Sequence, residues 1–437
     1  MTIYFVAGEV SADNHGAALM RSLRELDPEL KFIGRGGPQM QRVAGRQFKN
    51  WIGDAAVLGL WEVLRKYGYF REQFRGTLKE IQDSKPNAVV LIDYPGFNLR
   101  LASALRRQAL QQKVIYYISP QLWAWNPGRV KKMARSVDLV LCIFPFEADL
   151  YKKSGMRAVF VGHPMLERLQ ARKIDVERDP NLIGLFPGSR SREVRKIFPI
   201  MIETSRLLLQ ARPRLHFQVA AASEELLQEI RTMLTPHLHP LPAQGGEETM
   251  QTAASREAGR LPNGLSPQTP LPSSRGEGRV RGATLLNREA IEIILGETAQ
   301  IMQRAWAGIV ASGSATLEAA YFQMPFVLVY KVAWPTYLAA RAVVNVNYLG
   351  MPNLLADKQV ISEFIQQQAK PGVIAKAMGP LIEHVQARQQ MISAFDVIIS
   401  KLGGGGASQH AAQAILEELK ERQSPSGLGG LSRTVGT

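Results

Sequence analysis

The residues best suited to bind an anion lie in the segment Leu185–Val194. It reads Leu-Phe-Pro-Gly-Ser-Arg-Ser-Arg-Glu-Val and stands between an apolar pair and an amphipathic run. That order predicts a strand, a tight turn at Gly188 and a helix that Ser189 can cap. Unpaired amides at the helix start, together with the guanidinium of Arg190, would attract a phosphate or diphosphate. The alternative is an ordinary turn with solvated arginines.

A second segment, Ala311–Ala319, repeats this order of strand, turn and helix. Small residues in its turn let backbone amides approach a diphosphate, and its hydroxyl groups can donate hydrogen bonds. Glu318, in the first helical turn, could accept hydrogen bonds from a ribose or simply complement the helix dipole. Two such helix starts in one domain favour a bound nucleoside diphosphate. The small and hydroxyl-bearing residues concerned are Ser312, Gly313, Ser314 and Thr316.

Acidic and polar residues follow two other predicted strands. Asp93 ends the apolar run Ala88–Asp93, at the carboxyl end of a predicted parallel strand. Burial there raises the proton affinity of a carboxyl toward general-base chemistry, whereas helix capping is the alternative role. The first predicted strand leads into Ala7–Gly16, which forms either a capped helix start or a cleft wall. The side chains that this segment would present to a polar substrate are Glu9, Ser11, Asp13 and His15.

A tryptophan-rich segment, Ser119–Asn126, follows another predicted strand. Its rings would stack on a sugar or base, or pack between domains. The sequence contains no Asp-x-Asp triplet, no His-Glu-x-x-His and no Cys-x-x-Cys, and its seven histidines show no metal-ligand spacing. We therefore expect no metal and no cofactor. Backbone amides, hydroxyl groups and Arg190 would offset the charge of a diphosphate.

Short apolar strands alternate with amphipathic helices along the chain. One series runs over residues 1–170, and a second over residues 180–375, after a polar connector. This pattern predicts an α/β fold with two Rossmann-like, doubly wound domains that face each other across a cleft. Residues 240–282, rich in Pro, Gly, Ser and Thr, predict a disordered insertion, and residues 423–437 predict a disordered tail.

The composition restricts the class of partner. A net charge of +15 indicates a phosphorylated substrate, an anionic lipid surface or nucleic acid. The lone Cys142 excludes an internal disulfide. No run of about twenty apolar residues occurs and no basic region precedes the first strand, so a cytosolic protein is expected. Val57–Arg71 and Arg192–Met201 combine apolar and basic residues, which suits either a bilayer interface or a core face with solvated flanks.

Seven motifs, in order, resemble those of the lipid-A-disaccharide synthases. The resemblance covers about residues 1 to 420 apart from the insertion, and Ala12 stands where the family usually has glycine. The motifs are Phe5–Asp13, Ile92–Asn98, Tyr117–Trp125, Val161–Pro164, Leu185–Arg190, Ala311–Glu318 and Leu349–Leu355.

The resemblance implies a glycosyltransferase of the GT-B type. It implies condensation of UDP-2,3-diacylglucosamine with 2,3-diacylglucosamine 1-phosphate (lipid X), inversion of the anomeric centre without a metal, and release of UDP. It further implies a peripheral place at the inner face of the cytoplasmic membrane and no nucleic-acid partner. Residues 1–170 would form the acceptor-binding domain and residues 180–375 the UDP-sugar-binding domain. C-terminal helices at about 380–420 would complete the first domain, and exchange of such helices between subunits would allow a homodimer.

We expect Asp93 to accept the proton of the acceptor hydroxyl, with Asp13 and His15 as the next candidates for this role. Arg190 would offset the charge on the departing UDP. The alternative is another UDP-sugar enzyme of the GT-B type, such as a UDP-sugar epimerase or a peptidoglycan-type N-acetylglucosamine transferase. A non-catalytic binder of anionic lipid or nucleic acid is the third reading. The other residues expected to contact substrate are Glu9, Ser11, Gln121, Gly188, Ser189, Ser312, Gly313, Ser314, Thr316, Glu318 and Asn353.

Overall fold

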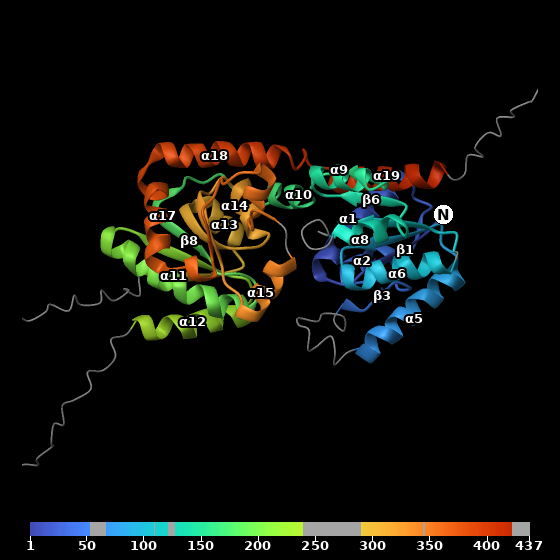
Figure 1. Cartoon of the computed structure of the whole chain (residues 1–437), viewed down its shortest axis with the longest axis horizontal. Coiled ribbons are helices and arrows are strands. Elements are labelled where there is room, and N and C mark those ends of the chain that lie inside the picture. Colours follow the sequence, from blue (N-terminus) through green and yellow to red (C-terminus); the bar gives the residue numbers. More distant parts are fainter. Residues whose placement is uncertain (53–66, 109, 121–126, 239–289, 344–345, 422–437) are drawn as a thin grey trace, which may run out of the picture.

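The computed structural model contains two α/β lobes, each built on a parallel sheet (Figure 1). The predicted class of two doubly wound α/β domains is confirmed. The segments 240–282 and 423–437, Gln121 and most of Val57–Arg71 lie outside the described residues. The structure describes residues 1–52, 67–108, 110–120, 127–238, 290–343 and 346–421.

The first lobe carries a seven-stranded parallel sheet. Ile92 in its centre pairs with Ala7 on one neighbouring strand and with Tyr117 on the other. The carboxyl ends of these three strands therefore lie at one level, and the residues that follow them emerge side by side. The strands are, in spatial order, β3 (Lys49–Asn50), β2 (Lys31–Gly36), β1 (Thr2–Ala7), β4 (Ala88–Ile92), β5 (Lys113–Tyr117), β6 (Leu139–Cys142) and β7 (Arg157–Phe160).

Helices cover both faces of this sheet. In β1, Ile3 and Phe5 contribute to one core cluster, whereas Tyr4 and Val6 contribute to the other. Successive side chains of a strand point to opposite faces, so a continuous apolar run fits a sheet buried on both sides. The helices of this lobe and of the connection that leaves it are α1 (Val10–Leu26), α2 (Pro38–Ala44), α5 (Tyr67–Ser84), α6 (Pro95–Arg107), α8 (Pro127–Ala134), α9 (Pro145–Lys153) and α10 (Met165–Gln170).

The second lobe carries a six-stranded parallel sheet. Val310 pairs with Phe186, and Ala311 pairs with Val329, so the ends of these strands also lie at one level. The strands are, in spatial order, β10 (Ile291–Leu295), β9 (His216–Ala221), β8 (Asp179–Phe186), β11 (Ala305–Ala311), β12 (Phe326–Tyr330) and β13 (Glu363–Ile365). The helices are α11 (Ser191–Ala211), α12 (Glu224–Leu238), α13 (Thr298–Arg304), α14 (Ala315–Tyr321), α15 (Trp334–Val343), α16 (Met351–Ala356), the 3-10 turn η2 (Gln366–Gln368) and α17 (Pro371–Glu383).

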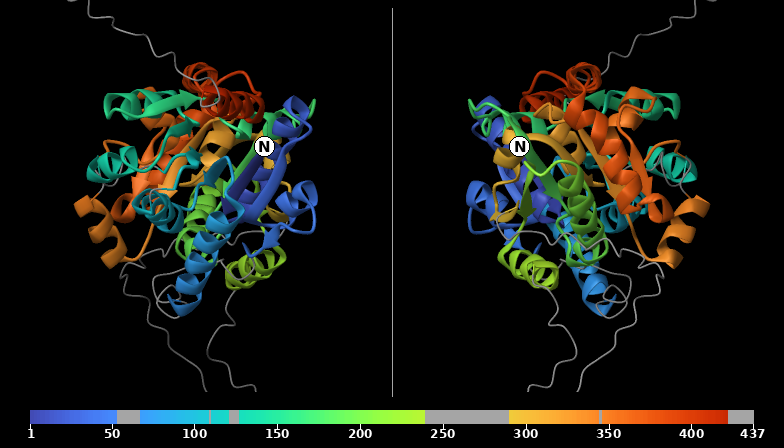
Figure 2. Two further views of the ribbon diagram at one scale, coloured as in Figure 1. Left: turned by 90° about the vertical axis from the view of Figure 1, so that its right-hand side faces the viewer. Right: turned by 90° about the vertical axis from the view of Figure 1, so that its left-hand side faces the viewer.

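The last two helices of the described chain divide between the lobes. In α18 (Val385–Ser400), Phe395 stacks on Phe326 of β12 with ring centroids 5.7 Å apart, so this helix belongs to the second lobe. In contrast, α19 (Ala407–Glu421) packs on α1 of the first lobe, and its Glu418 pairs with Lys113 at 2.6 Å. The expected segment of about 380–420 was therefore too wide, because α18 places its apolar face on the other lobe. The views in Figure 2 show these helices, in red, along one edge of the molecule.

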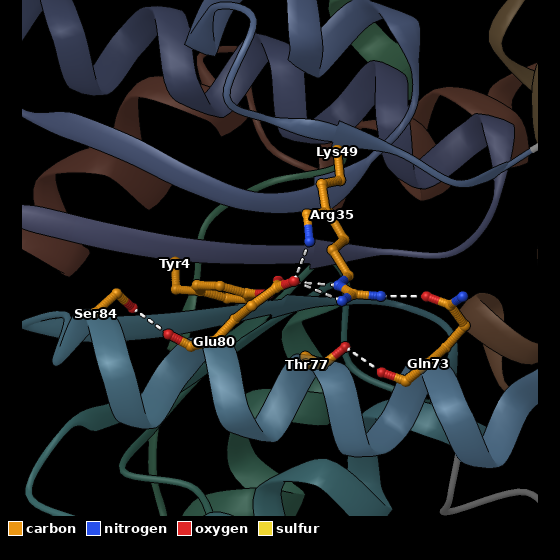
Figure 3. A network of polar contacts seen from close by, with 7 residues as sticks. All are labelled: Tyr4, Arg35, Lys49, Gln73, Thr77, Glu80 and Ser84. Carbon is orange, nitrogen blue, oxygen red and sulfur yellow. Dashed lines mark hydrogen bonds and ion pairs between the residues drawn. The ribbon is translucent and has the colours of Figure 1, made fainter.

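A polar network holds α5 against one face of the first sheet (Figure 3). Glu80 of α5 accepts hydrogen bonds from Tyr4 Oη at 2.7 Å and Arg35 Nη2 at 2.7 Å, and it pairs with Lys49. Arg35 also donates to Gln73, two helical turns earlier on α5. Burial opposes ionisation of Glu80, but these hydrogen bonds outweigh burial and lower its pKa to about 2. Charge-assisted bonds therefore fix the position of α5.

Over the described ranges, no helix combines the length and apolar character that a bilayer crossing requires.

Candidate active site

The turn after β8 is shaped by Gly188, whose φ of 116° is unfavourable for other residues. A Cβ at this position would approach Glu193 Oε2 to 2.9 Å. The helix α11 begins at Ser191 with Arg190 as its N-cap, so the expectation that Ser189 caps it was wrong. No described side chain caps α11. Glu193 N–H bonds back to Arg190 O at 2.9 Å, so the amides of Ser191 and Arg192 are the ones left for an anion.

The guanidinium of Arg190 lies at the surface beside this turn. Its side chain is 69% exposed, and Nη1 lies 3.2 Å from Glu193 Oε1 one turn along α11. An exposed pair of this kind contributes little stability, so the guanidinium can leave it at small cost. Arg190 is thus positioned to meet an anion at the start of α11.

The turn after β11 also exposes its backbone. Gly313 has a φ of 151°, and no described atom lies within 4 Å of a Cβ built there. Ser312 N–H donates to Val329 O at 3.1 Å, whereas Gly313 and Ser314 are exposed. The hydroxyl of Thr316 is not presented to a ligand, in contrast to the prediction. Thr316 is fully buried, and its Oγ1 donates to Gly313 O at 2.8 Å, which closes the turn.

Glu318 of α14 pairs with α10, the helix that connects the two lobes. Its Oε1 pairs with Arg168 Nη2 of α10 at 2.7 Å, and its side chain is only 13% exposed. On the next turn of α14, Tyr321 Oη donates to Gln170 Oε1 at 2.6 Å. Glu318, the residue predicted to bind a ribose, therefore already uses one of its two carboxylate oxygens in the ion pair with Arg168.

Asp93 stands in strained backbone after β4. Asp93 and Tyr94 have φ values of 46° and 50°, the left-handed region that side chains with a Cβ disfavour. The conformation is held because the carbonyl of Asp93 accepts hydrogen bonds from Tyr116 Oη at 2.6 Å and Asn98 Nδ2 at 2.8 Å. The ring of Tyr94 covers Gly8, where a Cβ would come within 2.4 Å of it.

Burial raises the pKa of the Asp93 carboxyl to about 6, and the negative charge of Glu9 adds to the effect. A backbone hydrogen bond from Tyr94 acts in the opposite direction. Glu9 and Ser11 are both exposed at the start of α1, which follows β1 in the sheet beside β4. The structure thus brings Asp93 and Glu9 together, and it gives Asp93 the proton affinity that a general base requires near neutral pH.

Asp13 has a structural role, and the expectation that it could act as a base was wrong. It is buried, and its carboxylate accepts hydrogen bonds from Gly37 N and Met40 N at Oδ1 and from Gln39 N at Oδ2, at 2.9 to 3.0 Å. These amides belong to the start of α2 and would otherwise lack partners. A carboxylate engaged in this way caps a helix and is not directed at a substrate.

Asn353 is also structural rather than part of a cleft wall. It is fully buried, and its Nδ2 donates to Ile361 O and Glu363 Oε1 at 2.9 and 2.8 Å. Its Oδ1 accepts hydrogen bonds from Val360 N and Ile361 N at 2.7 and 2.9 Å. Every polar atom of the side chain is thus used to fix the loop before β13.

Two residues at the junction were not predicted from the sequence. His163 lies after β7, and Arg168 lies on α10. His15 and His163 are neutral at neutral pH: burial lowers the pKa of each to about 4, with further contributions from Arg168 and, for His163, from His15. The motif Val161–Pro164 contained His163, but only the folded chain brings it near His15 and Arg168. Within the described ranges, no group of three or more His, Cys, Asp or Glu side chains could hold a metal ion.

The chain is similar to known proteins over nearly its whole length. It is 33% identical over 425 residues to the lipid-A-disaccharide synthase of Geobacter sulfurreducens, an alignment that covers 95% of this chain and 97% of that protein. The lipid-A-disaccharide synthase of Coxiella burnetii is 31% identical over 422 residues, again covering 95% of this chain and 97% of that protein.

Solved structures share the fold at low sequence identity. A co-structure of S. aureus MnaA with UDP has a TM-score of 0.58 at 13% identity, covering 98% of this chain and 100% of that chain. The UDP-GlcNAc 2-epimerase of Neisseria meningitidis, bound to UDP-GlcNAc, has a TM-score of 0.53 at 11% identity, covering 95% and 99%. The calicheamicin glycosyltransferase CalG4 has a TM-score of 0.50 at 13% identity, covering 97% and 99%. These similarities establish the fold alone, and they confirm the predicted GT-B type.

A family model described as lipid-A-disaccharide synthetase matches residues 3–254 and 264–416. The resemblance carried by the seven motifs is thereby confirmed. The chain belongs to the lipid-A-disaccharide synthetase family, and it is a glycosyltransferase of lipid A biosynthesis.

Proposed function

We propose that the chain condenses UDP-2,3-diacylglucosamine with lipid X, inverts the anomeric centre and releases UDP. The observation that carries this proposal is Asp93, a carboxyl at the end of β4 whose pKa is raised to about 6 by burial. Its backbone is held by Tyr116 and Asn98, which limits the directions that the side chain can take. At neutral pH this carboxyl is mostly ionised and still basic enough to accept a hydroxyl proton.

The reaction needs one proton acceptor and one leaving group. The primary hydroxyl of the acceptor gives its proton to the carboxylate of Asp93 while its oxygen attacks the anomeric carbon of the donor. The bond between that carbon and the diphosphate oxygen breaks, and its electron pair departs with UDP. Attack from the face opposite UDP inverts the configuration. Glu9, exposed beside Asp93, would orient the attacking hydroxyl.

The second lobe would hold the donor. The open amides at the start of α11 and the exposed backbone of Gly313 and Ser314 suit a diphosphate. Of the two helices, α11 has 21 residues and α14 only seven, so α11 supplies the greater part of the helix dipole. Arg190 would leave Glu193 to offset the charge on UDP, without a metal ion. Glu318 would bind the ribose through Oε2, because Oε1 pairs with Arg168.

A peripheral place at the inner face of the cytoplasmic membrane belongs to the same proposal. Both substrates carry acyl chains, and the net charge of +15 would favour an anionic lipid surface. A homodimer remains a prediction of the family resemblance.

The direct test is product analysis by mass spectrometry after the purified full chain is mixed with UDP-2,3-diacylglucosamine and lipid X. We expect a disaccharide 1-phosphate and UDP in equal amounts, and an unchanged yield when EDTA is present. Unacylated UDP-N-acetylglucosamine is the control that separates this function from those of other UDP-sugar enzymes. Turnover of the unacylated sugar alone, or a requirement for magnesium or manganese, would contradict the proposal.

A further inference from the structure

A groove on the first lobe is lined in part by the residues that follow the proposed base. It has a volume of about 830 Å³, lies between α5, α6 and α8, and its lining includes Tyr94, the residue after Asp93. Phe70 and Phe74 of α5 form an apolar wall, and Phe74 meets Phe97 of α6 edge to face with ring centroids 5.6 Å apart. The volume lies within the range of small-molecule binding sites.

The rim of this groove is positively charged. Arg71 of α5, Arg100 and Arg107 of α6 and Lys132 of α8 line it, and all four residues are exposed. None of the described lining residues is acidic, and no described carboxylate forms an ion pair with any of these four. An apolar groove with unneutralised cations at its rim is complementary to a ligand that has both acyl chains and negative charge.

Two serine hydroxyls lie among these cations. Ser103 Oγ and Ser136 Oγ are 3.4 Å apart and link α6 to the turn after α8. Arg100 and Arg107 stand three residues before and four residues after Ser103, so the three side chains share one face of α6. Ser136 Oγ donates to the carbonyl of Lys132 at 3.2 Å, and Lys132 lines the same groove. Ser103 Oγ donates to Leu99 O at 2.9 Å, so each hydroxyl must rotate away from its backbone acceptor to donate to a phosphate, and the cations are the main phosphate ligands.

The spacing along α6 relates this cluster to the base. Arg100 is five residues after Pro95, the first residue of α6, and this corresponds to a rise of about 7–8 Å. The first residue of α6, two residues after Asp93, is therefore separated from Arg100 by about the span of one sugar ring.

We infer that this groove binds the lipid acceptor. Its phosphate monoester lies on Arg100, Lys132 and Ser103, and an acyl chain runs along the wall formed by Phe70 and Phe74. The inference rests on the proposed function, in which the acceptor is a phosphorylated diacylglucosamine. The network of Glu80 is the positioning element, because it holds α5, and with it the apolar wall, against the sheet.

The test compares the full chain with the double variant Arg100→Ala/Lys132→Ala. Both side chains are exposed, so the variant should fold. We expect the KM for lipid X to rise by about tenfold to a hundredfold, because charge-assisted hydrogen bonds to the phosphate are lost. The KM for UDP-2,3-diacylglucosamine and kcat should change little. Arg135→Ala is the matched control, since Arg135 is exposed next to α8 but does not line the groove.

A second measurement is independent of turnover. Calorimetry of lipid X in detergent micelles, without donor, should show binding to the wild type and to Arg135→Ala, and weakened binding to the double variant. If the wild type made no disaccharide but this difference in binding persisted, the proposed function would fail and the assignment of the groove would stand. An unchanged KM and affinity for lipid X would overturn the assignment. The assignment would also be overturned if the double variant lost only its binding to phosphatidylglycerol vesicles, because the groove would then be a membrane contact.

Discussion

The facing edges of the two sheets use left-handed backbone in different ways. On the first lobe, Asp93, Tyr94 and Ile118 follow strands with φ values of 46°, 50° and 58°. On the second lobe, the two turns proposed to bind the diphosphate use Gly188 and Gly313, whereas Gln366, after β13, has a φ of 51°. Side chains with a Cβ are strained in this region and glycine is not. At the candidate site, the first lobe therefore accepts backbone strain to place side chains, whereas the two glycine turns of the second lobe expose backbone amides.

This difference matches the different chemical tasks proposed for the two lobes. A proton acceptor must be a side chain held in one direction, and buried hydrogen bonds from Tyr116 and Asn98 fix the backbone that carries it. A diphosphate is bound by amides that approach it closely, which requires turns without a Cβ. Changing a side chain on the first lobe should therefore affect the chemical step, and changing a glycine on the second lobe should affect nucleotide affinity.

The largest effect is expected for Asp93→Asn. The amide cannot accept the proton of the acceptor hydroxyl, so kcat should fall by about 10² to 10⁴ while UDP affinity stays unchanged. Steady-state kinetics and calorimetry of UDP measure the two quantities. Asp83→Asn is the matched control, because Asp83 is exposed at the end of α5. Near-normal turnover of Asp93→Asn would remove Asp93 from the role of base.

The pH dependence of kcat/KM should report the ionisation of the Asp93 carboxyl. Its pKa is raised to about 6, so kcat/KM should fall by about tenfold per pH unit below that value as the base becomes protonated. The free energy of unfolding should depend on pH in the opposite direction. The folded state holds this proton more tightly than the unfolded state, so the contribution of Asp93 to stability decreases as pH rises from about 4 to about 6.

Asp93→Asn should therefore stabilise the protein at neutral pH by about 1–3 kcal/mol, with the difference largely gone near about pH 4. Chemical unfolding at the two pH values measures this change. A pH-independent difference between variant and wild type would show that the carboxyl is not perturbed by burial.

The glycine turns of the second lobe should respond less strongly. Gly188→Ala adds strain at a φ of 116° and brings Cβ to 2.9 Å from Glu193 Oε2, which displaces the partner of Arg190. We expect UDP affinity to fall by about tenfold with kcat nearly unchanged. Gly313→Ala adds strain without a described neighbour within 4 Å, so its effect on calorimetric UDP affinity should be smaller. A larger loss of UDP affinity in Gly313→Ala than in Gly188→Ala would mean that the main diphosphate contact lies at the turn after β11.

The fold could be predicted because its signals are local. Apolar runs such as Ala88–Ile92 are buried over their whole length, and the helices between them keep apolar residues on one side. The placement of α18 could not be predicted, because an apolar helix face does not specify which lobe it covers. Only tertiary packing of Phe395 on Phe326 settles that point.

The candidate site was predictable in part for a related reason. Asp93 and Gly188 stand at the ends of strands, and parallel topology alone brings such positions to one edge. Asp13 and Thr316 have the same polar character and also stand near strand ends, yet both are buried and bonded to backbone. Sequence does not distinguish a carboxylate that caps a distant helix from one that faces a substrate. Arg168 was missed because its partner, Glu318, is 150 residues away.

The smallest effect on catalysis is expected for Asp13→Asn, which tests that distinction directly. The amide retains one oxygen acceptor for the amides of Gly37 and Met40, but its NH₂ group would face the N–H of Gln39. We expect a loss of about 1–2 kcal/mol in the free energy of unfolding, because the cap of α2 is weakened. Turnover per folded molecule should stay at the wild-type value, since no proton passes through this carboxylate. Chemical unfolding and kinetics on the same preparation distinguish a helix-capping role of Asp13 from a catalytic one. A lower kcat without any loss of stability would return Asp13 to the reaction and would mean that helix capping and proton transfer share one carboxylate.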